Sequence, residues 1–501
     1  MRFKSAQPIF TFLLVFLTAG TIGIYIRLFP LRHYTSDTSW DKASLLVVNN
    51  AVNAIRNKIN DSSTTLLSEQ KQIQLAKTKL NEVMSTEKKE LKDAIYRVAK
   101  KIDQEVAPRY PFPYLLASDS YYYYALTQKI AQTGRLSPEI KGSKYFYPEM
   151  SAPTGYWEPL TLHPYVGFAV YKIAQLFNPN IPLMFAVSFT PLVMTLLILL
   201  VFLALAQNQR CSGWAMLIAG VYLLCARIFL KRSAFAWYDN DSYSVFFPML
   251  LMLILSFAFC AENRGKKIYC GILAAITLSL YTMFWQGWMF VATVLAASGA
   301  LLIILERLMK KPSAERSTRF WAVFGLCALA CISVIFGVKE IFVLFQEGWQ
   351  ALLGFMNAKL SVWPETYVAV GELKKLSLSA NVGLTGGWFA LAISLFGLIS
   401  RTRQMFVEKN IVRHRLFIVT VIFAAAASVI SIGAQRFTLL CVTPFSILFL
   451  FGVHDLLELI TGLTAKIPQL RQPLIQKVGI PVAICLALII PKAVHSENTM
   501  V

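Results

Sequence analysis

The sequence predicts an all-α polytopic membrane protein with about 11 transmembrane helices, and three observations support this fold class. Hydrophobic residues make up 56% of the 501-residue chain, charged residues only 15%, and the mean hydropathy is +0.55. Soluble domains contain roughly 25% charged residues, so a soluble fold is excluded. Many of the basic residues behind the net charge of +21 fall in short connections between apolar runs. Positive charge there orients spans towards the cytoplasm, so nucleic acid is not an expected partner.

The first apolar run extends from Pro8 to Ile26 and follows Arg2 and Lys4. A cleaved signal peptide would have a shorter apolar run and a small-residue cleavage site. We therefore interpret residues 1–33 as a first span with its flanks and a cytoplasmic N-terminus. The other predicted spans are 181–206, 211–229, 243–261, 267–283, 286–306, 319–337, 386–402, 414–432, 437–457 and 475–491.

Residues 34–110 differ from the rest, because they are polar, lysine-rich and almost free of glycine and proline. Apolar residues recur there at the three-, four- and seven-residue spacings of an amphipathic helix. An earlier helix over 43–59 is expected to pair with it as an extracytoplasmic hairpin, turning near residues 61–63. We interpret the hairpin as a solvated spacer, and a partner-docking arm is the alternative. The residues of the apolar stripe are Leu80, Met84, Leu91, Ile95, Val98 and Ile102.

The rest of the chain divides at its long polar connections. Residues 111–180 form an extracytoplasmic loop with interfacial helices, including the short apolar run 165–177, and residues 181–337 form a transmembrane bundle. A second large loop, 338–385, precedes the C-terminal spans 386–501. This topology places the basic connections on one face of the membrane and the acidic segments on the other, as the positive-inside rule expects. The basic connections are 264–267, 310–319, 401–415 and 466–477.

The segment Trp237–Asp241 carries two carboxylates, Asp239 and Asp241, between an apolar run that ends near Leu230 and one that begins at Tyr243. Charge this close to a bilayer is costly unless it meets water, a counter-ion or a metal, so it marks a functional site. A single Asp-x-Asp is otherwise most often a solvated loop. The residues that share its side of the membrane therefore decide its role.

The predicted topology places Asp119, Arg436 and a loop glutamate, Glu365 or Glu372, on that same side. Each also has a simpler interpretation when taken singly. Asp119 would cap a helix N-terminus, Glu372 would be a solvated loop charge, and Arg436 would extend to the interface from a span end.

Three or four carboxylates drawn together would repel one another strongly unless a divalent cation held them. All-oxygen ligation suits Mg²⁺ or Mn²⁺ rather than zinc. Such an ion can neutralise a pyrophosphate leaving group, and an arginine can bind its oxygens through two parallel hydrogen bonds. The residue set therefore indicates transfer of a sugar from a polyprenyl-phosphate carrier whose tail lies in lipid.

The eight cysteines lie in or at the edges of apolar runs. Neither a disulfide framework nor a thiolate metal site is therefore expected. His163 and His414 have no histidine or cysteine partner within reach along the sequence, so we expect them to pack in the core or at the interface.

Four motifs resemble the catalytic subunit of oligosaccharyltransferases, most closely the bacterial and archaeal single-subunit enzymes. They are Asp-x-Tyr-Tyr from Asp119, Tyr-Asp-x-Asp over Tyr238–Asp241, a glutamate in a late external loop, and Gln-Arg-Phe over 435–437. The likeness extends from about Leu115 to about Pro491. The second motif and Arg436-Phe437 are the most specific matches.

The resemblance implies a GT-C-type membrane glycosyltransferase with Asp119 and Asp239 as metal ligands. Asp241 would be an adjacent ligand or a supporting group. Glu372 best matches the family's loop glutamate, with Glu365 as a competitor. Asp119 and Glu372 would also act in catalysis, because in the family they hydrogen-bond the acceptor asparagine amide and twist its nitrogen out of conjugation.

The resemblance also implies that Arg436 binds the donor pyrophosphate, and Arg232 matches a family arginine more loosely. Family members usually continue into a soluble domain with Trp-Trp-Asp-Tyr-Gly, which reads the acceptor sequon, and residues 1–501 contain no Trp-Trp-Asp. A pair of spans is also missing between about Trp285 and Arg319. A separate acceptor-binding subunit, a different acceptor or an inactive relative would each account for these departures.

Three functions follow, and the first is favoured. The first is transfer of a glycan from a polyprenyl-linked donor to a protein asparagine on the extracytoplasmic face of a bacterial or archaeal membrane. The second is transfer to a glycan, lipid or wall polymer. The third is a transporter or an inactive scaffold. Transporters bind substrate near the bilayer midplane, whereas the acidic residues here lie at span ends.

Overall fold

The computed structural model describes two compact units, one of residues Leu28–Leu115 and one of Met1–Arg27 together with Leu116–Val501. Within them, the residues whose structure is described are 6–28, 30–31, 37–62, 78, 88–106, 114–150, 153–310, 314–339, 341–343, 346, 375–408 and 410–464.

The described part of the smaller unit contains two helices, α3 (Asp37–Ser62), which includes the helix predicted over 43–59, and α5 (Lys88–Val106), which carries the later part of the predicted apolar stripe. They pack through Ala43, Ile95 and Ala99. Both alanines are fully buried, and their small side chains allow the two backbones to approach closely. The connection between the helices lies largely outside the described residues, so the predicted hairpin is not confirmed.

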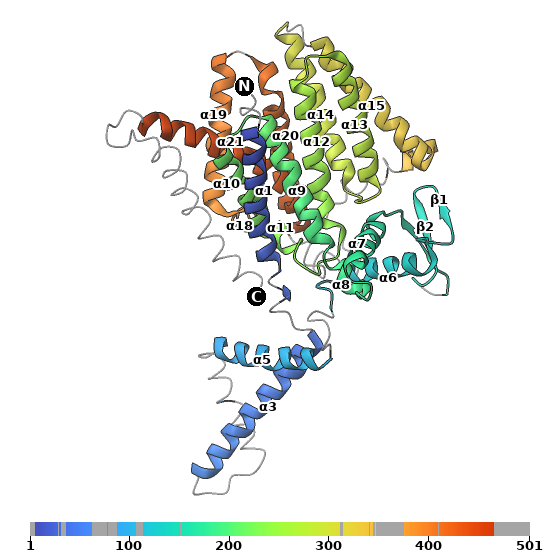
Figure 1. Cartoon of the computed structure of the whole chain (residues 1–501), viewed down its shortest axis with the longest axis vertical. Coiled ribbons are helices and arrows are strands. Elements are labelled where there is room, and N and C mark those ends of the chain that lie inside the picture. The colour runs from blue at the N-terminus through green and yellow to red at the C-terminus, as the bar shows by residue number, and fades with distance from the viewer. Residues whose placement is uncertain are drawn as a thin grey trace. The chain divides into compact units, whose positions relative to one another are not determined.

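The part of the larger unit that the structure describes is helical apart from one small sheet (Figure 1). Its helices are α1 (Ala6–Arg27), α6 (Ser118–Thr133), α7 (His163–Phe177), α8 (Leu183–Val187), α9 (Thr190–Asn208), α10 (Gly213–Cys225), α11 (Arg227–Lys231), α12 (Tyr243–Cys260), α13 (Arg264–Thr282), α14 (Trp288–Leu308), α15 (Ala314–Phe336), α18 (Leu378–Thr385), α19 (Gly387–Glu408), α20 (Arg415–Gly433) and α21 (Thr438–Thr464), with the 3₁₀ helices η1 (Asn240–Ser242), η3 (Ile411–His414) and η4 (Gln435–Phe437).

The described part of the chain contains seven helices long and apolar enough to cross a membrane, or up to eight if a bent pair counts as one span. The predicted span 475–491 lies outside the described residues, and each of the other predicted spans overlaps one helix or two consecutive helices. The count of 11 is nevertheless not confirmed. Helix α10 has only 13 residues, and α13 begins with Arg264, Lys266 and Lys267.

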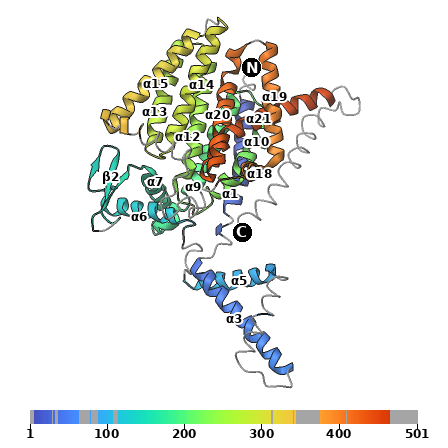
Figure 2. The ribbon, with the colours of Figure 1, turned by 180° about the vertical axis from the view of Figure 1, so that it is seen from behind.

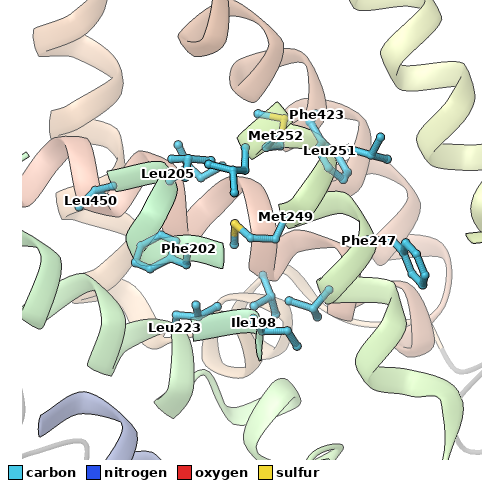
Figure 3. Packing of buried hydrophobic residues seen from close by; sticks show 14 of the residues in the cluster. Ile198, Phe202, Leu205, Leu223, Phe247, Met249, Leu251, Met252, Phe423 and Leu450 are labelled. Atoms are coloured by element: carbon cyan, nitrogen blue, oxygen red, sulfur yellow. The ribbon is translucent and has the colours of Figure 1, made fainter. Parts of the chain in front are cut away.

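Helices α9, α12, α20 and α21 form the centre of the larger unit, where apolar side chains from several spans interlock. Figure 3 shows Met249 and Met252 of α12 among Phe202 of α9, Phe423 of α20 and Leu450 of α21. Helices α13 and α15 pack against each other on one side of this centre, and α10 and α19 pack against α21 on the other (Figures 1 and 2).

Two local features depart from a simple bundle. Three short strands, β1 (Ile140–Lys141), β2 (Lys144–Tyr147) and β3 (Tyr156–Pro159), form an antiparallel sheet, which the all-α prediction did not include. Tyr145 of β2 is completely buried, in a cluster with Leu126 and Ile130 of α6. Helices α18 and α19 meet at 82°, and Gly386 and Gly387 have φ of 135° and 85° at the bend, which glycine adopts without a Cβ clash.

Candidate functional site

The turn that carries the paired carboxylates begins at a strained alanine. Ala236 has φ of 68°, a left-handed conformation that costs a residue with a Cβ about 1–2 kcal/mol. Its N–H donates to the Ser188 carbonyl at 3.1 Å, and its carbonyl accepts from the Leu116 N–H at 3.1 Å. These bonds tie the turn to the end of α8 and to the segment before α6. Strain of this kind persists only where the surroundings fix the backbone.

Two side chains of the turn form hydrogen bonds with helix α6. The Tyr238 hydroxyl lies 2.7 Å from the Thr127 hydroxyl, and Asn240 Nδ2 donates to the Tyr123 hydroxyl at 2.7 Å. Tyr123, in the run of four tyrosines over 121–124, therefore serves as a polar contact between α6 and the turn. The hydroxyls of Tyr123 and Thr127 were not anticipated from the sequence, because nothing in the local pattern shows which side chains meet the turn.

Asp119 lies in the first turn of α6. Because hydrogen bonds join α6 to the turn, Asp119 lies in the region of Asp239 and Asp241. The N-cap of this helix is Ala117 and its first residue is Ser118. The simpler interpretation of Asp119 as an N-cap is therefore wrong. Asp119 is exposed, as a ligand for an incoming ion or substrate needs to be.

His163 packs against Tyr238 of the turn and against Tyr123 and Tyr243. Its ring centroid lies 4.7 Å from that of Tyr123, 4.4 Å from that of Tyr238 and 5.5 Å from that of Tyr243. Its Nδ1 lies 3.1 Å from the Tyr243 hydroxyl. Burial lowers the pKa of His163 to about 3, so the ring is neutral. The structure agrees with the expectation of a packing role.

Gly167 provides the first test of this packing, because an added Cβ would lie 1.9 Å from the Tyr238 hydroxyl oxygen. Gly167→Ala should displace Tyr238 and lower the free energy of unfolding by about 1–3 kcal/mol, as overpacking typically does. Thermal unfolding of the purified full chain measures this. Gly383→Ala is the matched control, since a Cβ there meets nothing within 4 Å. Equal stability of Gly167→Ala and wild type would contradict the described packing.

The two carboxylates of the turn have different surroundings. Asp239 is partly buried, and its Oδ1 accepts from the Asn240 N–H at 2.6 Å, which caps η1. Asp241 is only 4% exposed. Its Oδ2 accepts from Arg232 Nη1 at 2.8 Å and from Trp237 Nε1 at 3.2 Å, and the Arg232 guanidinium lies 5.2 Å from the Trp237 ring centroid. Asp241 is therefore one half of a buried ion pair.

Electrostatics connect these residues with Asp119 and Arg436. Burial raises the pKa of Asp239 well above its usual range, Asp241 and Asp119 raise it further, and the Asn240 N–H and Arg436 oppose the rise. Burial also raises the pKa of Tyr123, with Asp239 as the next cause. Arg436 is exposed in η4, directly before α21. Side chains from three separate connections thus share one neighbourhood with an excess of negative charge.

This neighbourhood fits a divalent cation in its chemistry, since the carboxylates are oxygen donors that repel one another. A cation among them would offset the repulsion that adds to the effect of burial on the pKa of Asp239. Asp119, Asp239 and Asp241 do not, however, bring one oxygen each within 4.8 Å of one another. Asp241 turns Oδ2 towards Arg232 instead. Closure around an ion would require Asp119 or Asp241 to move, or an oxygen from elsewhere to complete the set.

Among the described residues, one group of three does meet that distance, namely His454, Asp455 and Glu458 on α21. It begins 18 residues after Arg436, roughly 27 Å along the chain if helical throughout. Both oxygens of Asp455 accept from Arg401, at 2.7 and 3.1 Å. The group is therefore a charge network remote from the candidate site. The predicted loop glutamates, Glu365 and Glu372, lie outside the described residues.

Comparison with known proteins decides the family. Residues 107–490 match the family model described as oligosaccharyl transferase STT3, N-terminal. The chain belongs to the STT3 oligosaccharyltransferase family. The match includes Asp119, Asp239, Asp241 and Arg436, so the resemblance inferred from the motifs is confirmed.

Relatives of this STT3 chain are distant and longer. A dolichyl-phosphooligosaccharide-protein glycotransferase of Methanococcus voltae is 21% identical over 383 residues, which cover 67% of this chain and 40% of that protein. The archaeal oligosaccharyltransferase AglB from Archaeoglobus fulgidus, in complex with an inhibitory peptide and a dolichol-phosphate, matches with a TM-score of 0.57 and 16% identity. That match covers 77% of this chain and 52% of the AglB chain.

A second structure of the Archaeoglobus fulgidus oligosaccharyltransferase, in complex with Zn and sulfate, has a TM-score of 0.54 and 16% identity over 77% of this chain and 49% of that one. This STT3 chain therefore spans about half the length, or less, of the relatives it matches. The structural likeness confirms the predicted GT-C-type fold of the membrane region. The family and the apolar helices together make the chain an integral membrane protein.

Proposed function

We propose that this chain transfers a glycan from a polyprenyl-(pyro)phosphate donor to an asparagine of a protein acceptor. The observation that supports this most strongly is the shared neighbourhood of Asp119, Asp239, Asp241 and Arg436 at the ends of apolar helices, in a chain of the STT3 family. The site would lie on the extracytoplasmic face, with the N-terminus cytoplasmic, as the charge asymmetry of the connections favours.

In this proposal, Asp119 and Asp239 hold Mg²⁺ or Mn²⁺, and Asp241 borders the ion. Glu372, from the 338–385 loop, is the further oxygen donor that the set needs. When bound, the ion would neutralise charge on the leaving pyrophosphate. Asp119 and Glu372 would accept hydrogen bonds from the acceptor amide and so weaken its conjugation.

The two arginines predicted to bind the donor phosphates are placed differently. Arg436 is exposed, so it is placed to meet an incoming headgroup and bind its oxygens through two parallel hydrogen bonds. Arg232 is buried and paired with Asp241. We therefore propose that Arg436 contacts the donor directly, and that Arg232 supports the site through Asp241. Acceptor binding is proposed to involve a separate subunit.

The test is transfer in membranes that contain the full chain and a defined polyprenyl-linked donor. A peptide with an Asn-x-Thr sequon and a glycan acceptor are offered side by side. Glycosylation of the peptide supports the proposal. Transfer only to the glycan would establish the alternative acceptor class, and transfer to neither, with an intact folded chain, would favour a scaffold role.

The proposal also predicts that transfer requires a bound divalent metal ion. Treatment of these membranes with EDTA should reduce transfer by at least about a hundredfold, because several kcal/mol of charge stabilisation is lost with the ion. Added Mn²⁺ or Mg²⁺ should restore the rate. The comparison with EDTA already saturated by Mn²⁺ controls for effects of the chelator itself. A rate that is insensitive to EDTA after exhaustive dialysis would contradict the metal assignment.

A further inference from the structure

The first transmembrane helix ends in a fully buried arginine that the proposed function does not use. Arg27 is the last residue of α1, and its side chain is 0% exposed, although arginine is rarely buried to this extent. Its Nε donates to the Ser233 hydroxyl at 2.8 Å, and its Nη1 donates to the Gly23 carbonyl at 3.2 Å. A buried charge is costly unless hydrogen bonds satisfy it, so these contacts define its position.

The backbone of Arg27 holds the same segment. The Phe235 N–H donates to the Arg27 carbonyl at 3.0 Å, and the guanidinium carbon lies 5.0 Å from the centroid of the Phe229 ring. The Ser233 hydroxyl in turn donates to the Phe229 carbonyl. The end of α1 therefore contacts Phe229, Ser233 and Phe235 in the connection that follows α10.

This connection leads directly into the candidate site. Arg232, next to Ser233, forms the ion pair with Asp241, and Ala236, next to Phe235, begins the strained turn. A shift of Ser233 or Phe235 would therefore move both the ion pair and the turn that carries Asp239.

We propose that Arg27 is a positioning residue for the carboxylate site. It fixes α1 to residues 229–235 and thereby holds the Arg232–Asp241 pair and the Asp239 turn in place. It acts through Ser233 and Phe235 and contacts neither donor nor acceptor. Its effect on transfer rests on the proposed function, whereas its effect on the turn does not.

Hydrogen exchange on the full chain in detergent tests the effect on the turn. Arg27→Met should increase exchange of peptides that cover 229–241 at least tenfold, while peptides of α14 and α15 stay unchanged. Arg27→Lys should restore part of the protection, because an ammonium can still donate to Ser233. Thr18→Val is the control, since Thr18 bonds only the Leu14 carbonyl of its own helix, at 2.8 Å.

Unchanged exchange of 229–241 in Arg27→Met would overturn the proposal. If Arg27→Met unfolds throughout, Ser233→Ala replaces it, because that variant removes the hydroxyl partner and leaves the charge. Local acceleration in Ser233→Ala supports the proposal, and protection equal to wild type overturns it.

Transfer kinetics separate positioning from general stability. Arg27→Met should lower kcat at least tenfold and raise the Mn²⁺ concentration needed for half-maximal rate, with the KM for the lipid donor within twofold of wild type. Arg27→Lys should recover most of kcat. Faster exchange with wild-type kcat and Mn²⁺ requirement would overturn the role in transfer. If wild type itself transfers nothing, the proposed function fails, while the exchange result still decides whether Arg27 holds the turn.

Discussion

Replacement of Asp239 by alanine is expected to reduce transfer about a thousandfold, which corresponds to roughly 4 kcal/mol of transition-state stabilisation. The charges of Asp119, Asp241 and Arg436 all influence the pKa of the Asp239 carboxylate. Its Oδ1 is held by the Asn240 N–H, so its position does not depend on the ion. Removing it should therefore abolish the metal contact without disturbing the helices.

Initial rates in membranes, normalised to the amount of chain in the membrane fraction, measure this effect. Asp239→Asn is the matched control, because it keeps the size and the Oδ1 acceptor that caps η1 but removes the charge. We expect it to be nearly as inactive as alanine and as stable as wild type, since burial already disfavours the charged form of Asp239 in the absence of the ion. Full activity in both variants would show that Asp239 is not part of the active site.

Much of the fold follows from the positions of apolar runs, because each described run predicted as a span overlaps one helix or two consecutive helices. Run length alone, however, does not show where a helix breaks. The predicted span 211–229 ends as α10 at Cys225 and restarts as α11 at Arg227, since Ala226 adopts ψ of 119° between them. Gly386 and Gly387 similarly bend the start of the span predicted at 386–402. Such breaks depend on packing between helices that are distant in sequence.

The candidate site, like the fold, could be predicted only in part from the sequence. The motif around Asp239 and the charge of Asp119 and Arg436 were recognisable from the sequence, because charge at span ends is rare and costly. Their partners were not. Thr127 lies 111 residues from Tyr238, and Arg27 lies 206 residues from Ser233. Neither pairing leaves a periodic pattern in the sequence, so only the three-dimensional structure reveals it.

Breaking the Arg232–Asp241 pair should have the second large effect. In this case the effect on the free energy of unfolding can be distinguished from the effect on the transfer rate. Arg232 and Asp241 have 9% and 5% side-chain exposure and lie 2.8 Å apart. Loss of one partner from a buried pair leaves an uncompensated charge and typically costs roughly 3–5 kcal/mol. We therefore expect Arg232→Met to lower the free energy of unfolding by about this amount, as measured by denaturant unfolding of the purified chain in mixed micelles.

The double variant Arg232→Met/Asp241→Asn should recover most of that stability, because it removes both charges and leaves residues of similar volume. Its transfer rate should stay low, since asparagine supplies no negative charge beside the ion. A different result follows if Arg232 acts mainly on the donor phosphates. Arg232→Met would then fold with wild-type stability and raise the donor KM. The single variant thus distinguishes a structural ion pair from a substrate contact, and the double variant shows whether the charge of Asp241 is needed beyond its bond to Arg232.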